Sequence, residues 1–251
     1  MGWWSLNCGG ATRLLWQAMA RLLHISDTHL LGPDSESEYP EVDPRGRLIT
    51  VLAAAGVAGP FDAVVLTGDI ADDGSREAVL CARELLRPMA PVVVAVSGNH
   101  DGTDVVAEVF GTDSPRIGAW QILRAATNQT GEIAGQAGPV LDLLDSCTAP
   151  TAILMHHPVR SHSTHPWFTL ADGEELEQRL SKHRRPLVLL SGHTHEAFED
   201  VVGDVRLLGA PSTFYGIRHD GEQFEPHGAP TGALIVELSD EGTSETQLVL
   251  A

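Results

Sequence analysis

Five short apolar runs in this sequence each end in a cluster of polar residues, and this arrangement constrains the fold more than any other feature. Short apolar runs that stop at turn-forming residues are typical of strands buried in an α/β core. In open α/β sheets, ligands bind beyond the carboxyl ends of the strands. Five polar clusters at five strand ends can therefore meet at one site. The runs cover residues 21–26, 63–67, 92–96, 152–155 and 187–190.

The remaining segments predict helices between the runs and further strands after them. Helical apolar spacing bounded by Gly and Pro predicts helices at residues 47–57, 75–86 and 174–183, and a weaker one at 140–144. An additional strand is expected at residues 119–123, and residues 128–138 are rich in turn formers. The C-terminal part alternates like half-buried antiparallel strands, at residues 201–208, 233–238 and 246–250.

The first twenty residues form a segment that we leave out of the core. An apolar stretch at residues 14–16 echoes a signal peptide but is too short to be one. A second interpretation starts the protein at Met19, because the first strand follows at once. The sequence leaves open whether residues 1–18 belong to the natural protein. We expect a non-core extension over residues 1–20 and a single domain over residues 21–251, since no linker or internal repeat divides the chain.

Charge and composition limit the classes of partner. The formal net charge is -18, from 16 basic and 34 acidic residues, which argues against broad nucleic-acid binding. No apolar run reaches the roughly 20 residues of a membrane span. Cys8, Cys81 and Cys147 lie far apart, so neither a disulfide framework nor a thiolate zinc site is implied. We expect a soluble protein of the cytoplasm.

The five polar clusters are informative as a set rather than singly. Each has an ordinary explanation in a turn or an exposed loop, because Asp, Asn, Gly and His are common there. Gly-His-Thr-His differs slightly, since an extended segment places alternate side chains on the same side. Their coincidence at five strand ends favours a common site. The clusters are Asp27-Thr28-His29, Gly68-Asp69, Gly98-Asn99-His100-Asp101, His156-His157-Pro158 and Gly192-His193-Thr194-His195.

This ordered set resembles the calcineurin-like metallophosphoesterase superfamily, over residues 21–238, and looks most like its bacterial class III cyclic-nucleotide phosphodiesterases. The resemblance implies a four-layer α/β/β/α sandwich. It also implies two metal ions. Asp27, His29 and His195 match the ligands of the first ion. Asn99, His156 and His193 match those of the second, and Asp69 matches the carboxylate that bridges both.

Two ions about 3.5–4 Å apart can hold both the attacking and the leaving oxygen of an in-line displacement. A hydroxide that bridges the ions becomes the nucleophile, because metal binding lowers the pKa of water. Oxygen and imidazole ligands suit Fe, Mn, Zn or Co, as divalent or trivalent ions. Only Asp27 and Asp69 are anionic in the ligand set, so two divalent ions leave a local positive charge. That charge attracts an anionic ester to an acidic protein.

Further residues are predicted to handle the substrate. His100 matches the family's catalytic histidine, which is not a ligand and can donate a proton to the leaving alkoxide. Asn99, His100, His157 and Thr194 are candidate substrate contacts. Asp101 either orients this loop or makes ordinary loop hydrogen bonds, and His24 is expected to be packed in the first strand. Four aromatic residues can stack a nucleobase or pack against the sheet: Trp167, Phe168, Phe214 and Tyr215.

We expect hydrolysis of phosphodiesters, with 3',5'-cyclic AMP as the first candidate substrate. The same site suits a phosphomonoesterase, a nucleotide pyrophosphatase or a glycerophosphodiesterase. A non-catalytic scaffold is a third class, but it should have lost ligands, and all seven positions are filled here. Relatives often form homodimers, which makes a homodimer possible. The sequence identifies neither the native metals nor the loops that select the substrate.

Overall fold

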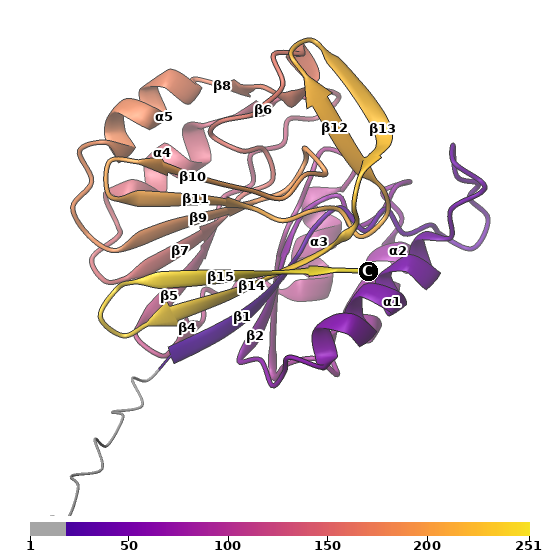
Figure 1. Cartoon of the computed structure of the whole chain (residues 1–251), viewed down its shortest axis with the longest axis horizontal. Coiled ribbons are helices and arrows are strands. Elements are labelled where there is room, and N and C mark those ends of the chain that lie inside the picture. Colours follow the sequence, from indigo (N-terminus) through magenta and orange to yellow (C-terminus); the bar gives the residue numbers. More distant parts are fainter. Residues whose placement is uncertain (1–18) are drawn as a thin grey trace, which may run out of the picture.

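The computed structural model describes residues 19–251, and two β-sheets form its centre (Figure 1). Most of the expected N-terminal extension lies outside these residues. Met19 and Ala20, which we assigned to that extension, pair with Ser239 and Leu238 in the first sheet. Within the described part, no helix is long and apolar enough to cross a bilayer.

The first sheet has the strand order β15-β14-β1-β2-β3. Strands β1, β2 and β3 are parallel, and β14 runs antiparallel to β1. All five residues of β2 are buried, as expected for a parallel strand covered on both faces. The strands are β1 (Met19–Ile25), β2 (Ala63–Thr67), β3 (Val92–Val96), β14 (Gly232–Ser239) and β15 (Ser244–Leu250).

The second sheet has the strand order β10-β11-β9-β7-β5-β4. Its three central strands, β9, β7 and β5, are parallel, and β11 joins β9 in parallel. The strands are β4 (Arg116–Ile117), β5 (Trp120–Arg124), β7 (Thr151–Leu154), β9 (Leu187–Ser191), β10 (Phe198–Val202) and β11 (Val205–Gly209). Two shorter pairs complete the described strands: β6 (Gly135–Gln136) with β8 (Leu170–Ala171), and β12 (Gly216–Asp220) with β13 (Gln223–Ala229).

Helices cover the outer face of each sheet and leave the two inner faces in contact (Figure 1). Alternation along β1 shows how this arises: Leu23 and Ile25 belong to the apolar cluster shared with the helices, while Leu22 belongs to the cluster between the sheets. The predicted α/β/β/α sandwich is confirmed. The helices of the described residues are α1 (Pro44–Gly56), α2 (Arg76–Leu86), α3 (Thr103–Phe110), α4 (Gly138–Leu144) and α5 (Gly173–Leu180), together with the 3-10 turn η1 (Pro166–Phe168).

The observed elements follow most of the expected ones, but the β12–β13 hairpin and the short strands β4, β6 and β8 were not expected, and two further differences are instructive. Residues 201–208 were expected as one strand, and this was wrong: β10 and β11 form a hairpin that turns at Gly203, whose φ is 62°. Glycine adopts a positive φ without the steric cost that a side chain brings, so the chain can reverse there. Helix α3 was not expected at all. It directly follows the Gly98–Asp101 cluster, whose polar residues hid its start.

Candidate metal centre

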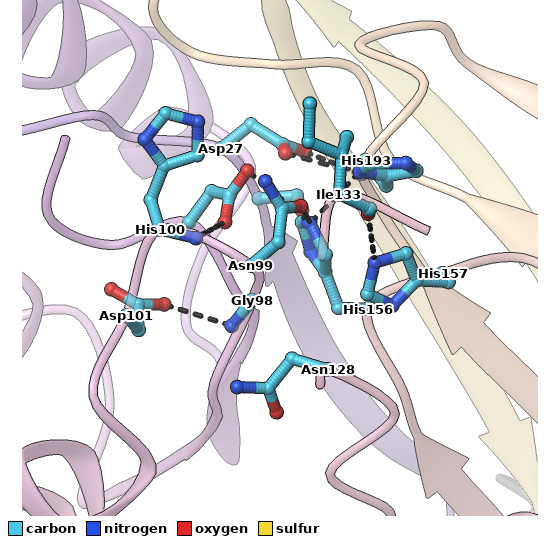
Figure 2. Close-up of polar contacts among 12 residues, drawn as sticks. Asp27, Gly98, Asn99, His100, Asp101, Asn128, Ile133, His156, His157 and His193 are labelled. Carbon is cyan, nitrogen blue, oxygen red and sulfur yellow. Dashed lines mark hydrogen bonds and ion pairs between the residues drawn. The ribbon is translucent and has the colours of Figure 1, made fainter. Parts of the chain in front are cut away.

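The five polar clusters meet at the carboxyl ends of strands from both sheets. Asp27, Asp69 and Asn99 follow β1, β2 and β3 of the first sheet, whereas His156 and His193 follow β7 and β9 of the second. Figure 2 shows Asp27, Asn99, His156 and His193 gathered around one point. The polar clusters that follow the parallel strands of both sheets thus lie close together, as the sequence predicted.

Asp27, His29 and His195 form the first half of the site. The Nε2 atoms of His29 and His195 lie 3.1 Å apart, and Nε2 of His195 lies 3.5 Å from Oδ1 of Asp27. All three side chains are at least 95% buried. Their ligand atoms lie within 4.8 Å of one another, close enough to bind one ion.

Asn99, His156 and His193 form the second half. Nε2 of His156 lies 3.1 Å from Oδ1 of Asn99 and 3.2 Å from Nδ1 of His193. Each half therefore combines side chains from both sheets, because His195 completes the first half and Asn99 completes the second.

Asp69 lies between the two halves. Its Oδ2 is 3.8 Å from Nε2 of His29 and 3.3 Å from Nε2 of His156, and its Oδ1 accepts a hydrogen bond of 3.0 Å from the backbone N–H of His100. The distances from Oδ2 to these two imidazole nitrogens differ by only 0.5 Å. This oxygen therefore lies nearly midway between the two halves and can contact an ion in each. This position fits the bridging role that the resemblance implied for Asp69.

Hydrogen bonds at the outer nitrogens orient all four histidines. Carbonyl oxygens carry no proton, so each facing ring nitrogen must donate one. His156 donates from Nδ1 to Thr67 O (2.7 Å), His193 from Nε2 to Trp167 O (2.8 Å), and His195 from Nδ1 to Tyr215 O (2.8 Å). Nδ1 of His29 faces the carboxylate of Asp72 at 2.8 Å. Metal-binding histidines are usually fixed in this way.

The inner nitrogens of His193 and His195 consequently carry lone pairs, and each faces an inner nitrogen of another histidine. Nε2 of His29 and Nε2 of His195 lie 3.1 Å apart, so a proton or a metal ion must lie beside them to offset the repulsion of two lone pairs. Burial lowers the pKa of His193 and His195 well below the ordinary value, so both rings are neutral. At His156 burial also opposes charge, but Asp69 outweighs it and raises the pKa to about 9. The donor set thus favours cations at its centre and fits two metal ions.

Comparison with known proteins agrees with this geometry. The family model for calcineurin-like phosphoesterases matches residues 20–197, well over half of the chain. The chain belongs to this family. It is 29% identical to a probable cyclic nucleotide phosphodiesterase of Synechococcus sp., over 90% of this chain and 91% of that protein. It is 27% identical to the 3',5'-cyclic adenosine monophosphate phosphodiesterase CpdA of Pseudomonas aeruginosa, over 91% and 89%.

Solved structures support the fold. A dimetal phosphatase from Danio rerio superposes with a TM-score of 0.59, covering 93% of this chain and 99% of that one, at 13% identity. The chain is therefore a metallophosphoesterase, an enzyme that hydrolyses phosphate esters, and its His and Asp clusters can hold the metal ions of this family.

The backbone of this metallophosphoesterase is strained at five of the seven candidate ligands. Asp27, His29, Asp69, His193 and His195 all have a positive φ, between 43° and 69°. Such a conformation costs a non-glycine residue on the order of 1 kcal/mol or more and persists where surrounding contacts enforce it. Five left-handed residues at one site are the mark of a functional centre rather than of ordinary turns.

Two glycines allow the loops to approach one another. A Cβ added to Gly98 would lie 2.2 Å from Oδ1 of Asp69, and one added to Gly192 would lie 1.7 Å from Oγ of Ser26. Neither contact is possible for a real side chain. The glycines that precede Asn99 and His193 are therefore required by the packing of loop against loop, which the turn explanation of these motifs did not foresee.

Asp101 ties two of these loops together. Its carboxylate accepts hydrogen bonds from the backbone N–H groups of Ile70, Ala71 and Gly98, at 2.9–3.1 Å. Both of the roles considered for Asp101 thus apply, because these loop hydrogen bonds also orient the segment that carries Asn99 and His100.

His100 lies beside the metal centre and is partly exposed. Its Nδ1 donates to the backbone oxygen of Asp72 at 2.9 Å, which leaves Nε2 free. Its ring centre is 4.9 Å from that of His29, and its side chain lines a cavity of about 510 Å³. The resemblance predicted a catalytic histidine next to the ligands, and the side chain has the position and the free nitrogen for that role.

The cavity has the metal centre as its floor. Its rim consists of residues 36–39, η1 and the β12–β13 hairpin, which all contribute to the lining. The β12–β13 hairpin projects beyond the two sheets (Figure 1). All four aromatic residues named from the sequence line the cavity, although Phe168 and Phe214 are also buried. No lysine or arginine is among the described residues that line it. The aromatic lining consists of Tyr39, Trp167, Phe168, Phe214, Tyr215 and Phe224.

Two predicted substrate contacts lie outside the lining of the cavity. His157 is buried, donates from Nε2 to Ile133 O (2.9 Å) and faces the Thr127 hydroxyl with Nδ1 (2.8 Å), as Figure 2 shows for Ile133. Burial, followed by His156, lowers the pKa of His157 to about 3. Thr194 is 2% exposed. The ring of His157 packs against those of His156 and His193, with ring centres 4.8 Å and 4.4 Å apart. His24 is packed, as expected, and its Nε2 faces the Thr67 hydroxyl at 2.8 Å.

Sequence reasoning missed Asp72 and Tyr39. Asp72 orients His29 through its carboxylate and His100 through its backbone oxygen. Tyr39 packs on Tyr215 with ring centres 4.8 Å apart and lines the cavity. Asp72 follows Asp69 by three residues, a spacing that could have suggested a shared site. Tyr39 lies in a stretch rich in Ser, Glu and Pro, where no pattern marks a binding residue.

Proposed function

We propose that this metallophosphoesterase hydrolyses phosphodiesters and that 3',5'-cyclic AMP is its substrate. The observation that carries the proposal is the centre itself, in which four histidines direct inner nitrogens at one another around Asp69. The choice of a diester is supported by relatives that are named cyclic nucleotide phosphodiesterases and that match nearly the whole chain.

We assign the seven ligands as the sequence predicted, in the two halves described above, with Asp69 shared. Two bound ions would neutralise the phosphoryl charge and activate water. Fe, Mn, Zn and Co are the candidate metals. His100 would donate a proton from Nε2 to the leaving oxygen, because Nδ1 is held by Asp72 O. The Asn99 amide lies at the cavity wall, where it can also contact the substrate.

The aromatic rim favours a nucleotide over a small alkyl diester. Trp167 is 48% exposed, and both Trp167 and Tyr39 line the cavity, from different segments of the rim. Stacked aromatic contacts contribute about 0.5–1.5 kcal/mol beyond the burial of area. This is enough to position a nucleobase while the phosphodiester lies over the floor. A cytoplasmic location and a homodimer remain predictions of the sequence.

The test compares three substrates on protein reconstituted with each candidate metal. We expect hydrolysis of cyclic AMP and of bis-p-nitrophenyl phosphate, with much slower hydrolysis of p-nitrophenyl phosphate. The Asp69→Asn variant controls for contaminating enzymes. Faster hydrolysis of the monoester, or activity confined to nucleotide pyrophosphates or glycerophosphodiesters, would replace the proposed substrate class. A protein that binds fewer than one metal ion per chain and hydrolyses nothing would instead be a scaffold.

A further inference from the structure

We propose that Glu36 and Glu38 form an electrostatic filter that favours singly charged diesters over doubly charged monoesters. The inference rests on the proposed function and adds to it a reason for the choice of ester. Both glutamates line the catalytic cavity, in the segment of the rim that contains Tyr39.

Charge is distributed unequally over this cavity. The floor carries the proposed metal ligands, and four further carboxylates line the cavity: Glu36, Glu38, Asp72 and Asp73. Among the described residues that line the cavity, no lysine or arginine offsets these carboxylates. An anionic substrate is therefore attracted by the ions at the floor alone and must pass a negatively charged rim to reach them.

The four carboxylates differ in what they contact. Asp72 faces the imidazole of His29 at 2.8 Å. Asp73 accepts from Gly32 N (2.9 Å), from Ser75 N (2.9 Å) and from the Ser35 hydroxyl, so it anchors the loop. Glu36 and Glu38 are exposed, and within residues 19–251 neither carboxylate has a hydrogen bond or an ion pair. Their charges are thus available to act on a ligand.

The segment that carries these glutamates is held at both ends. Ser35 N donates to Gly32 O (3.2 Å) on the side anchored by Asp73, and Val42 N donates to Tyr39 O (3.0 Å) on the other. Between them, Tyr39 N donates to the Ser37 hydroxyl (2.9 Å). Ser37 and Tyr39 are partly buried, and the glutamates that alternate with them are exposed. The position of the two charges at the rim is consequently built into the loop.

The reaction changes the charge that this filter senses. Hydrolysis adds water across one P–O ester bond: the water oxygen joins phosphorus, and the leaving oxygen takes a proton. The diester carries one negative charge, but the monoester product carries nearly two at neutral pH, since its second pKa is about 6. The rim therefore disfavours monoester substrates and also rebinding of the product.

The magnitude can be estimated from simple electrostatics. Two unit charges across about 10 Å of water change the affinity for one extra negative charge by roughly fourfold at low ionic strength. Salt near 0.5 M reduces this effect to little more than unity, because the Debye length becomes shorter than the cavity is wide. A filter of this size tunes the choice of substrate without affecting the chemistry at the floor.

The experiment uses the metal-loaded protein with Glu36→Gln and Glu38→Gln combined. Its matched control is Glu174→Gln with Glu175→Gln, which removes two exposed charges from the start of α5, away from the cavity. We measure kcat/KM for p-nitrophenyl phosphate relative to bis-p-nitrophenyl phosphate. The ratio should rise about fourfold in the rim variant, stay within about 1.5-fold of wild type in the control, and converge for all three proteins at high salt.

A binding measurement keeps this proposal separate from the proposed function. Calorimetric affinities for inorganic phosphate and dimethyl phosphate should show the same fourfold change in their ratio, whether or not any ester is hydrolysed. If the wild-type protein hydrolyses no diester but the rim variant still shows this shift in affinity ratio, the proposed function is overturned and the filter stands. An unchanged ratio in the rim variant, or an equal change in the control, would overturn the filter alone.

Discussion

The floor and the rim of the catalytic cavity differ in how their side chains are held. At the floor, six of the seven proposed ligands are buried, the outer nitrogens of the histidines have fixed partners, and five residues hold a positive φ. At the rim, Glu36 and Glu38 are exposed without partners among the described residues, and Trp167 is half-exposed. The floor is determined by backbone conformation and close contact. The rim is determined by charge and by aromatic surface.

This difference separates the reaction from the choice of substrate. A change at the floor alters geometry that many neighbours share, so its effect should be large and should extend to metal binding. A change at the rim alters only what the cavity attracts, so its effect should be small and should differ between substrates. The following variants test this division, beginning with the largest expected effect.

Asp69→Ala should cause the largest loss. It removes the carboxylate that reaches both halves of the centre and the acceptor for His100 N. We expect kcat for bis-p-nitrophenyl phosphate to fall by more than about 10³-fold, because charge stabilisation at the reacting centre is the main source of catalysis. Metal analysis of the purified variant should show fewer than two ions per chain. If the variant retains both ions and normal activity, Asp69 is not a metal ligand.

His100→Ala should reduce activity while leaving the ions in place. His100 lines the cavity with a free Nε2 but is not among the seven proposed ligands. Loss of a proton donor typically lowers kcat by about 10²–10⁴-fold. The drop should be smaller for p-nitrophenyl esters, whose leaving group needs little protonation, than for cyclic AMP. Equal losses on both substrates would argue that His100 stabilises phosphate rather than the leaving group.

Asp72→Ala tests support of the floor from outside the ligand set. The Asp72 carboxylate holds Nδ1 of His29, and such partners typically contribute about 10–100-fold in metal affinity. We expect a weaker affinity in this range by competition with a chelator. Asp72→Asn keeps an acceptor oxygen and should recover part of the loss. If both variants bind metal like the wild type, His29 is oriented by its packing alone.

Tyr39→Leu should have the smallest effect, as a change at the rim. Its ring contacts Tyr215 and lines the cavity, but Tyr39 is not among the proposed ligands. A lost aromatic contact of about 1 kcal/mol would raise KM for cyclic AMP by roughly fivefold and leave kcat nearly unchanged. Tyr39→Phe, which keeps the ring, serves as the control. A large fall in kcat for Tyr39→Leu would break the division between floor and rim.

The floor could be predicted from the sequence because its chemistry is concentrated in unusual residue types at strand ends. Asp27, His156 and His193 follow apolar runs, and a single order of motifs leads to the fold and to the family. The buried strands could be predicted equally well, since β2 and β3 were expected with their observed bounds. That prediction was possible because each apolar run ends at a polar cluster, so both features mark the same strand end.

The rest depended on contacts that no local pattern records. Asp72 acquires its role only because β1 and β2 are neighbours, which brings it to the imidazole of His29. His157 resembled a site residue in sequence, but the fold turns it toward Ile133 and Thr127. Tyr39 lies in a loop whose position is set by hydrogen bonds of Asp73. Such residues are found from tertiary structure alone.

The origin of the ligands in two sheets has a consequence for unfolding. Each half of the centre takes side chains from both sheets, so an ion bound there can remain fully coordinated only while the two layers stay docked. By linkage, ions at about 100 times their dissociation constant stabilise the folded chain by about 2.7 kcal/mol per site. Bound ions would thus cross-link the two sheets. Separation of the layers and release of the ions become a single cooperative event.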